Sequence, residues 1–185
     1  MKKILVTGGS GFIGSHLCDF LLKRNNFVIA LDNNYSSNKL NIGHLNNYKN
    51  FKFLNKDINK KINIKVDEIY HLACPASPKY YQMDPINTLK TNVIGTLNML
   101  ELANKYNSKI LLSSTSEIYG DPLSHPQNEK YWGNVNPIGP RACYDEGKRA
   151  AECLAFDFLR KYKTKIKIVR IFNTYGPRMD KYDGR

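Results

Sequence analysis

The stretch from Thr7 to Gly14, with the sequence T-G-G-S-G-F-I-G, constrains the fold of this chain most strongly. It follows a short β-rich run at Lys2–Val6 and opens an amphipathic stretch at Phe12–Lys23. Glycines placed between a strand and a helix are typical of the first turn of a dinucleotide-binding βαβ unit, whereas glycines without that context make ordinary turns. The pattern therefore predicts a phosphate-binding turn at the start of a Rossmann-like fold.

Each glycine of this turn has a separate physical role. Gly8 permits the tight turn, Gly11 lets the backbone approach a pyrophosphate, and Gly14 lets the helix pack closely on the strand. We expect the amides of Gly11, Phe12 and Ile13 at the helix start to meet the phosphates, because the positive end of the helix dipole favours anions there.

Asp32 ends the second apolar strand, Phe27–Leu31, at about the spacing expected for an acid that binds the ribose. Its carboxylate accepts hydrogen bonds from a ribose diol and repels a 2′-phosphate, so the sequence favours NAD over NADP as cofactor. Asp57 and Ile58, just past a third strand, could flank the adenine as an acceptor and an apolar wall. A solvated turn aspartate is the alternative interpretation of Asp32.

Strand-like and helix-like segments alternate along the rest of the chain. Further strands are expected at Phe51–Asn55, Glu68–Leu72, Lys109–Ser113 and Lys165–Ile171, and long helices at Pro85–Tyr106 and from about Arg141 to Tyr162, with an irregular segment at Gly120–Pro140. Such alternation predicts an α/β fold, a Rossmann-like doubly wound parallel sheet with helices on both faces. Ligands bind such sheets beyond the carboxyl ends of the strands.

Tyr144 and Lys148 stand four residues apart on a predicted helix, which places them on one face. A neighbouring ammonium and a positive nicotinamide stabilise a phenolate, so the pair is a candidate base for proton abstraction. Lysine at this spacing more often only solvates a helix. The end of the fifth strand adds Thr115 as a hydroxyl and Glu117 as a carboxylate, which favours the catalytic interpretation.

Composition limits the other classes of function. The net charge of +12 arises from lysines spread over the whole chain, without a dense basic block, so we expect no nucleic-acid partner. No apolar run approaches the ~20 residues of a membrane span, and we expect a cytoplasmic protein. The four cysteines form no C-x-x-C pair, so buried, reduced thiols are expected and no metal site.

Several longer motifs resemble the UDP-glucuronate decarboxylases, or UDP-xylose synthases, of the extended short-chain dehydrogenase/reductase family. They are H-L-A-C-P-A-S-P (71–78), P-I-N-T-L-K-T-N-V-I-G-T-L-N-M-L (85–100), S-T-S-E-I-Y-G (114–120), Y-W-G-N-V-N-P-I-G-P-R-A-C-Y-D-E-G-K-R (131–149) and R-I-F-N-T-Y-G-P-R-M (170–179). The resemblance covers essentially the whole chain, and the motif at 131–149 is far more specific than the glycine turn.

The resemblance implies a role for individual positions. In addition to Gly8 and Gly14 of the turn, those expected to hold NAD are Gly11, Phe12, Ile13, Asp32, Asn33, Asp57, Ile58, Leu72, Thr91, Tyr144, Lys148 and Thr174. Those expected to hold the nucleotide sugar are Lys90, Asn98, Asn173 and Arg185, and those at the reacting centre are Thr115, Glu117, Tyr144 and Lys148. The sequence departs from the family's usual residues at Glu101, Asn104 and Asp180.

The implied reaction is NAD-dependent decarboxylation of UDP-glucuronate to UDP-xylose through a 4-keto intermediate. A UDP-sugar 4-epimerase or 4,6-dehydratase shares the fold, the cofactor and the Tyr/Lys pair, although dehydratases prefer an Asp-Glu pair where Ser116–Glu117 stands. A non-catalytic NAD-binding module is the alternative from another class, but such a module has no need of a base.

The family architecture continues beyond Arg185 with a C-terminal substrate-binding lobe. We therefore expect residues 1–185 to be one NAD-binding Rossmann domain, the N-terminal part of that longer architecture. Because the substrate pocket has an open side, we expect this chain alone to bind NAD at best weakly and to catalyse poorly. The resemblance also implies a homodimer formed through the two long helices when the protein is full length.

Overall fold

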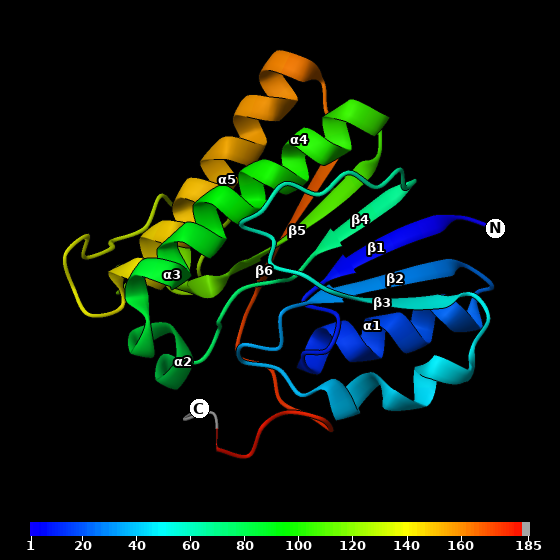
Figure 1. Ribbon diagram of the computed structural model, residues 1–185. Helices are drawn as coiled ribbons and strands as arrows, with labels where there is room; N and C mark the ends of the chain where they lie inside the picture. The colour runs from blue at the N-terminus through cyan, green and yellow to red at the C-terminus, as the bar shows by residue number, and fades with distance from the viewer. Residues whose placement is uncertain (183–185) are drawn as a thin grey trace.

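The computed structural model describes residues 1–182 and has a six-stranded parallel sheet at its centre (Figure 1). The strand order is β3-β2-β1-β4-β5-β6. The strands are β1 (Lys3–Thr7), β2 (Phe27–Asp32), β3 (Phe51–Asn55), β4 (Glu68–His71), β5 (Lys109–Thr115) and β6 (Ile166–Ile171). The predicted doubly wound fold is confirmed, because the order runs outward in both directions from β1 and β4.

Helices cover both faces of the sheet. One face carries α1 (Phe12–Lys23) and the 3₁₀ segment η1 (Lys39–Asn47), and the other carries α3 (Pro85–Lys90), η2 (Thr91–Gly95), α4 (Thr96–Tyr106) and α5 (Ala142–Tyr162) (Figure 1). Two short elements, α2 (Pro78–Met83) and η3 (Ser116–Tyr119), lie near the carboxyl ends of the strands.

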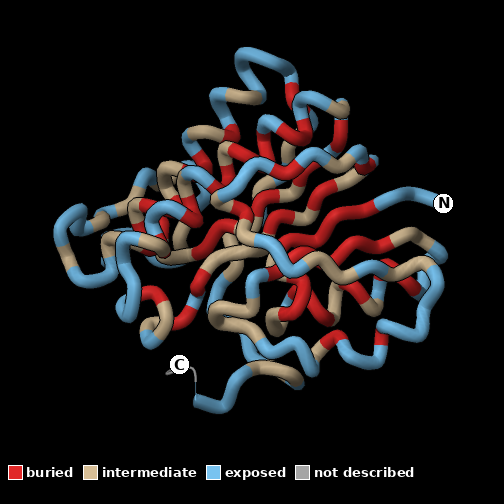
Figure 2. Tube along the Cα trace, viewed as in Figure 1, coloured by how far each residue is buried: buried red, intermediate tan, exposed pale blue. Residues whose placement is uncertain are grey.

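Apolar residues fill the space between the sheet and each helical layer, and the central strands are the most deeply buried part of the chain (Figure 2). On one face of the sheet, Val6 and Ala30 pack with Cys18 and Leu22 of α1. On the other face, Leu5 packs in the cluster that includes residues of α4 and α5. The edge strands β3 and β6 instead contain only partly buried and exposed residues. This difference explains why the central strands read as continuous apolar runs.

The predicted helix at Pro85–Tyr106 is present, but it widens into a π-helical turn at Thr91–Gly95. A Cβ on Gly95 would stand 2.4 Å from the Ile58 side chain, so the absence of a side chain lets this turn pack closely on the segment after β3. The helix expected from about Arg141 begins at Ala142, with Arg141 as its N-cap.

Three elements were not predicted from the sequence: η1, α2 and η3. Each lacks the apolar repeat that identifies a helix. The helix α2, for example, spans only six residues and buries only Tyr81. Within residues 1–182, no helix has both the length and the apolar character that crossing a membrane demands.

Candidate active site

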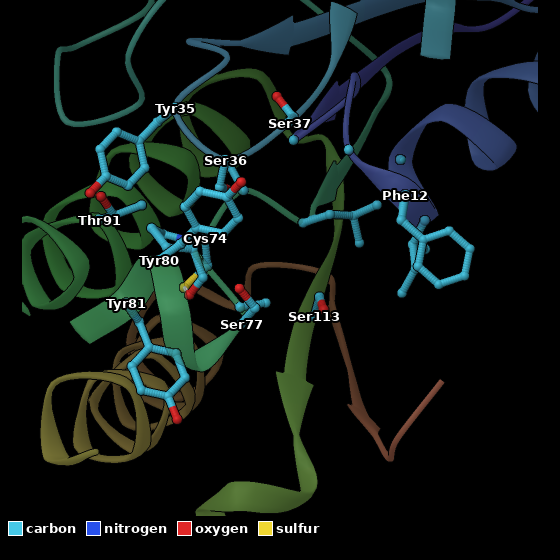
Figure 3. A pocket seen from close by; sticks show the side chains of 18 of the residues that line it. Phe12, Tyr35, Ser36, Ser37, Cys74, Ser77, Tyr80, Tyr81, Thr91 and Ser113 are labelled. Atoms are coloured by element: carbon cyan, nitrogen blue, oxygen red, sulfur yellow. Dashed lines mark hydrogen bonds between the residues drawn. The ribbon is translucent and has the colours of Figure 1, made fainter. Parts of the chain in front are cut away.

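A cleft of about 1130 Å³ opens at the carboxyl ends of the strands. Figure 3 shows Phe12 on one side of it and Tyr80, Tyr81 and Thr91 on the other. All of the residues predicted for cofactor binding and catalysis line this cleft: Gly8, Gly11, Phe12, Ile13, Gly14, Asp32, Asn33, Asp57, Ile58, Leu72, Thr91, Thr115, Glu117, Tyr144, Lys148 and Thr174. Asn173, which was predicted to contact the nucleotide sugar, lines it too. The topology thus brings together segments that are more than 160 residues apart in the sequence.

The glycine turn is closed by its own backbone. The Gly11 amide donates to the Gly8 carbonyl (3.1 Å), and the first helical bond of α1 runs from the Ser15 amide to the Gly11 carbonyl (3.0 Å). The amides of Phe12 and Ile13 precede that first bond, as the leading amides of any helix do. The role expected for three amides therefore rests on Phe12 and Ile13, because the Gly11 amide is already engaged.

This turn leaves no room for a side chain. Gly8 adopts a φ of +70°, and a Cβ there would lie 2.9 Å from the Ala73 amide nitrogen. A Cβ on Gly14 would stand 2.0 Å from the Gly8 carbonyl oxygen. The helix start is consequently held against β1 with its leading amides beside the cleft, which is the arrangement that fits a pyrophosphate.

The Asp32 carboxylate is fixed at the end of β2. It accepts hydrogen bonds from the Ser10 amide (3.1 Å), the Asn34 amide (2.9 Å) and the Ser37 hydroxyl (2.9 Å). A carboxylate has about four lone-pair sites, so these three donors leave acceptor capacity for a ribose hydroxyl. The glycine turn and Asp32 together fit an adenine dinucleotide with an unphosphorylated 2′-hydroxyl.

Tyr144 and Lys148 lie on the buried face of α5 beside the end of β5. The Lys148 ammonium donates to the Ser113 carbonyl (2.9 Å) and lies 5.8 Å from the centroid of the Tyr144 ring. Both side chains are buried but border the cleft. The predicted helical spacing thus places the phenol and the ammonium next to each other.

Thr115, the last residue of β5, and Glu117 of η3 line the same cleft. The Thr115 hydroxyl caps this short segment by accepting a hydrogen bond from the Glu117 amide (3.2 Å), while the Glu117 carboxylate pairs with the Arg141 guanidinium. Arg141 also approaches Asp145 (3.9 Å). One guanidinium therefore faces two carboxylates at the rim of the site, a partnership that sequence reasoning missed.

Burial changes the charge states around this rim. Desolvation, reinforced by Glu117 and opposed by Arg141, raises the pKa of Asp145 to about 6. Desolvation also raises the pKa of Tyr81, whose ring stacks on that of Tyr144. Carboxylates with a raised pKa are typical of sites that handle protons near neutral pH.

His71 links the sheet to the helical layer behind the site. Its Nδ1 is 2.7 Å from the Thr7 hydroxyl and its Nε2 is 3.1 Å from the Thr96 hydroxyl. Burial, together with the nearby Lys148 ammonium, lowers the pKa of His71 to about 3. The imidazole is therefore neutral, and its hydrogen bonds connect β4 to β1 and to α4 in the interior.

Two residues predicted to contact the sugar nucleotide, Lys90 and Asn98, are not among those that line the cleft. Lys90 is exposed, and Asn98 is buried with its amide donating to the Ile58 carbonyl (2.8 Å). In this position Asn98 holds the segment after β3, which itself lines the cleft. Arg185 lies outside the described residues.

The fold and the site together define a class: a Rossmann-type nucleotide-binding protein with a Tyr/Lys pair and a Thr/Glu pair at one cleft. A family model described as GDP-mannose 4,6 dehydratase matches residues 5–183. The chain therefore belongs to this family of extended short-chain dehydrogenases/reductases.

Individual relatives show the same similarity. The chain is 58% identical over 184 residues to UDP-glucuronic acid decarboxylase 6 of Arabidopsis thaliana, covering 99% of this chain and 54% of that protein. The chain spans about half the length of the curated relatives it matches.

Solved structures agree with the fold. UDP-glucose 4-epimerase of Thermotoga maritima, solved with UDP-glucose, gives a TM-score of 0.83 at 33% identity, covering 99% of this chain and 60% of that one. dTDP-glucose 4,6-dehydratase of Streptomyces venezuelae, with NAD bound, gives a TM-score of 0.83 at 28% identity, covering 96% and 57%.

Proposed function

We propose that residues 1–185 form the NAD-binding domain of an enzyme that decarboxylates UDP-glucuronate to UDP-xylose through a 4-keto intermediate. The convergence of Tyr144, Lys148, Thr115 and Glu117 on the cleft that holds the glycine turn carries this proposal. The structure supports chemistry at a sugar hydroxyl next to a dinucleotide, and the names of relatives 54–58% identical to the chain favour decarboxylation.

When bound, NAD would accept a hydride from the sugar C4 carbon and later return it. The residues that would hold it are Phe12 and Ile13 at the pyrophosphate, Asp32 at the adenosine ribose and Lys148 at the nicotinamide ribose. Lys148 suits this role because its ammonium is already oriented by the Ser113 carbonyl at the floor of the cleft.

The protein's own residues manage the proton and the sugar. Tyr144 takes the proton of the C4 hydroxyl, and the neighbouring Lys148 ammonium stabilises the resulting phenolate. Thr115 donates a hydrogen bond to the C4 oxygen. A ketone at C4 is β to the C6 carboxylate, so carbon dioxide can leave while the negative charge spreads onto the C4 oxygen. Glu117, held by Arg141, positions the ring or relays a proton for the return at C5.

The test is to incubate the chain, and a form extended to the length of the relatives, with NAD and UDP-glucuronate and to follow UDP-xylose by mass spectrometry. Tyr144→Phe should reduce turnover by about 10²-fold or more while NAD binding, measured by calorimetry, persists. Tyr162→Phe, on the exposed end of the same helix, is the matched control. Undiminished turnover by Tyr144→Phe with NAD bound would show that the base is wrongly assigned.

Parallel assays separate the rival functions. Conversion of UDP-glucose, by epimerisation at C4 or by loss of water, would replace the decarboxylase proposal with an epimerase or a dehydratase. Tight NAD binding without conversion of either sugar, by this chain and by a form extended to the length of the relatives, would indicate a non-catalytic NAD-binding module.

We also propose a homodimer and a cytoplasmic location. Apolar side chains are exposed along the outer faces of the helical layer, at Ile86, Leu89, Ile94, Phe156 and Leu159, which supports helix-to-helix association. The four cysteines are free, as expected in a reducing compartment. Sedimentation of the wild type and of Ile94→Glu tests the dimer: the variant should be monomeric, and equal masses would contradict the proposed interface.

A further inference from the structure

Behind the cleft, Glu152 of α5 and Arg170 of β6 form a bidentate ion pair. The Arg170 Nε donates to Oε1 (3.1 Å) and its NH2 donates to Oε2 (2.8 Å). Glu152 is buried, and Arg170 is largely covered. The hydrogen bonds that Arg170 donates to Glu152 raise the pKa of Arg170, so this pair stays charged inside the protein.

The pair also holds both ends of the segment that carries Thr115 and Glu117. On one side, the Ser114 hydroxyl donates to Glu152 Oε1 (2.5 Å). On the other side, Arg170 NH1 donates to the Tyr119 hydroxyl (2.8 Å). Thr115 and Glu117 therefore lie between two side-chain anchors that belong to one ion pair.

The spacing along α5 connects this pair to the candidate base. Tyr144, Lys148 and Glu152 follow each other at intervals of four residues, so they share one face of the helix. All three are buried against the end of β5, where Lys148 holds the Ser113 carbonyl and Glu152 holds the Ser114 hydroxyl. One face of α5 therefore carries the Tyr144 phenol and is also hydrogen-bonded to β5, the strand that leads into Thr115 and Glu117.

We infer that the Glu152–Arg170 ion pair is a positioning device that sets the placement of Thr115 and Glu117 relative to Tyr144. This role rests on the proposed function of those three residues. Neither Glu152 nor Arg170 lines the cleft, so the pair acts through the segment it holds and not on the substrate. Small displacements of reacting groups cost large factors in rate, which makes such an anchor consequential for turnover.

The first test is Glu152→Gln in the full chain, with UDP-glucuronate and NAD as ligands. We expect kcat to fall by roughly ten- to a hundred-fold, with the KM for UDP-glucuronate and the dissociation constant for NAD nearly unchanged. Asp157→Asn, which breaks an exposed ion pair with Arg160 on the same helix, is the matched control and should leave kcat unchanged. An unchanged kcat in Glu152→Gln would overturn the inference.

A second variant separates positioning from simple stabilisation. Glu152→Gln leaves the Arg170 charge buried without its partner, which destabilises a fold by itself. The double variant Glu152→Gln/Arg170→Gln removes both charges, so its melting temperature should recover toward the wild type while kcat stays low. Recovery of kcat together with the melting temperature would show that the pair only stabilises the fold.

Hydrogen exchange gives a measurement that does not depend on activity. In Glu152→Gln, amides of 114–119 should exchange faster, while those of β1 and the glycine turn keep wild-type rates. Unchanged protection of 114–119 would overturn the inference even in a chain without turnover. If the wild type released no carbon dioxide even in a form extended to the length of the relatives, while Glu152→Gln showed this exchange pattern, the proposed function would be refuted and the anchoring role would stand.

Discussion

The ring of Tyr81 is stacked on the ring of Tyr144, with 5.1 Å between their centroids and 13° between their planes. Tyr81 belongs to the short helix α2, whereas Tyr144 lies in the first turn of α5. Both rings border the cleft. The stack therefore restricts the orientation of the phenol that we assign as the base, and it does so from an element that local sequence patterns do not reveal.

Tyr81 offers a pair of substitutions that separate its ring from its hydroxyl. The hydroxyl is buried and finds no hydrogen-bond partner among residues 1–182, so Tyr81→Phe should leave the free energy of unfolding unchanged or raise it by up to about 1 kcal/mol. Tyr81→Ala deletes the stacked ring and should lower it by about 3–4 kcal/mol. Urea denaturation measures both, and equal losses in the two variants would contradict the assignment.

The comparison of sequence and structure shows which interactions local patterns can reveal. Strand β3 was predicted at its observed limits, since an apolar run between turn residues depends only on neighbours in the sequence. The Tyr144–Lys148 pair was also predictable, because helical spacing fixes it. Glu117 and Arg141 are 24 residues apart in the sequence, on either side of an irregular segment, and no periodicity encodes such a contact.

Asn98 illustrates what a family motif leaves open. Family resemblance assigned it to the nucleotide sugar, yet its amide donates to the Ile58 carbonyl and the side chain is buried in the interior. A sequence motif identifies the residue but not the direction in which its side chain points. That direction depends on the π-helical turn at Thr91–Gly95, which shifts the residues of α4 around the helix axis.

The buried imidazole of His71 predicts a pH dependence of stability. Its pKa is lowered to about 3 in the fold, against about 6.5 in an unfolded chain, so the unfolded state binds more protons between these values. The stabilising contribution of the neutral ring is complete above pH 6.5 and is lost as the pH falls toward 3, by up to about 1.4 kcal/mol per pH unit. His71→Asn lacks this titration and should show a shallower slope between pH 4.5 and 6.5 in urea denaturation. Parallel slopes for the two proteins would refute the assignment.

Asp145 predicts a dependence of the opposite sign. Its pKa is raised to about 6 in the fold, so the folded state binds more protons than the unfolded state between about 3.8 and 6. Stability associated with the neutral carboxyl is present below this window and is lost as the pH rises through it. Asp145→Asn should therefore become more stable than the wild type as the pH rises, by about 1–2 kcal/mol at pH 7.5 after allowance for solvent screening. Asp157→Asn, at an exposed carboxylate of the same helix, is the control. A stability difference that is constant from pH 4.5 to 7.5 would contradict this prediction.

Addition of one methyl group to the glycine turn, in Gly14→Ala, should lower both the stability of the fold and the affinity for NAD. In Gly14→Ala, the new Cβ would stand 2.0 Å from the Gly8 carbonyl oxygen, which is backbone and cannot rotate away. The start of α1 must then move off β1, at a cost of about 1–3 kcal/mol or more in the free energy of unfolding. NAD binding should weaken with it, because the amides of Phe12 and Ile13 move away from the pyrophosphate.

Gly43→Ala is the matched control, since a Cβ at that position of η1 would meet nothing within 4 Å. Its free energy of unfolding should stay within about 0.5 kcal/mol of the wild type or increase slightly, with unchanged NAD affinity. Denaturation in urea and calorimetric titration with NAD measure the two quantities on the same preparations. If Gly14→Ala kept wild-type NAD affinity, the close packing of α1 on β1 would not be what places these amides, and the assignment of the glycine turn as the phosphate site would fail.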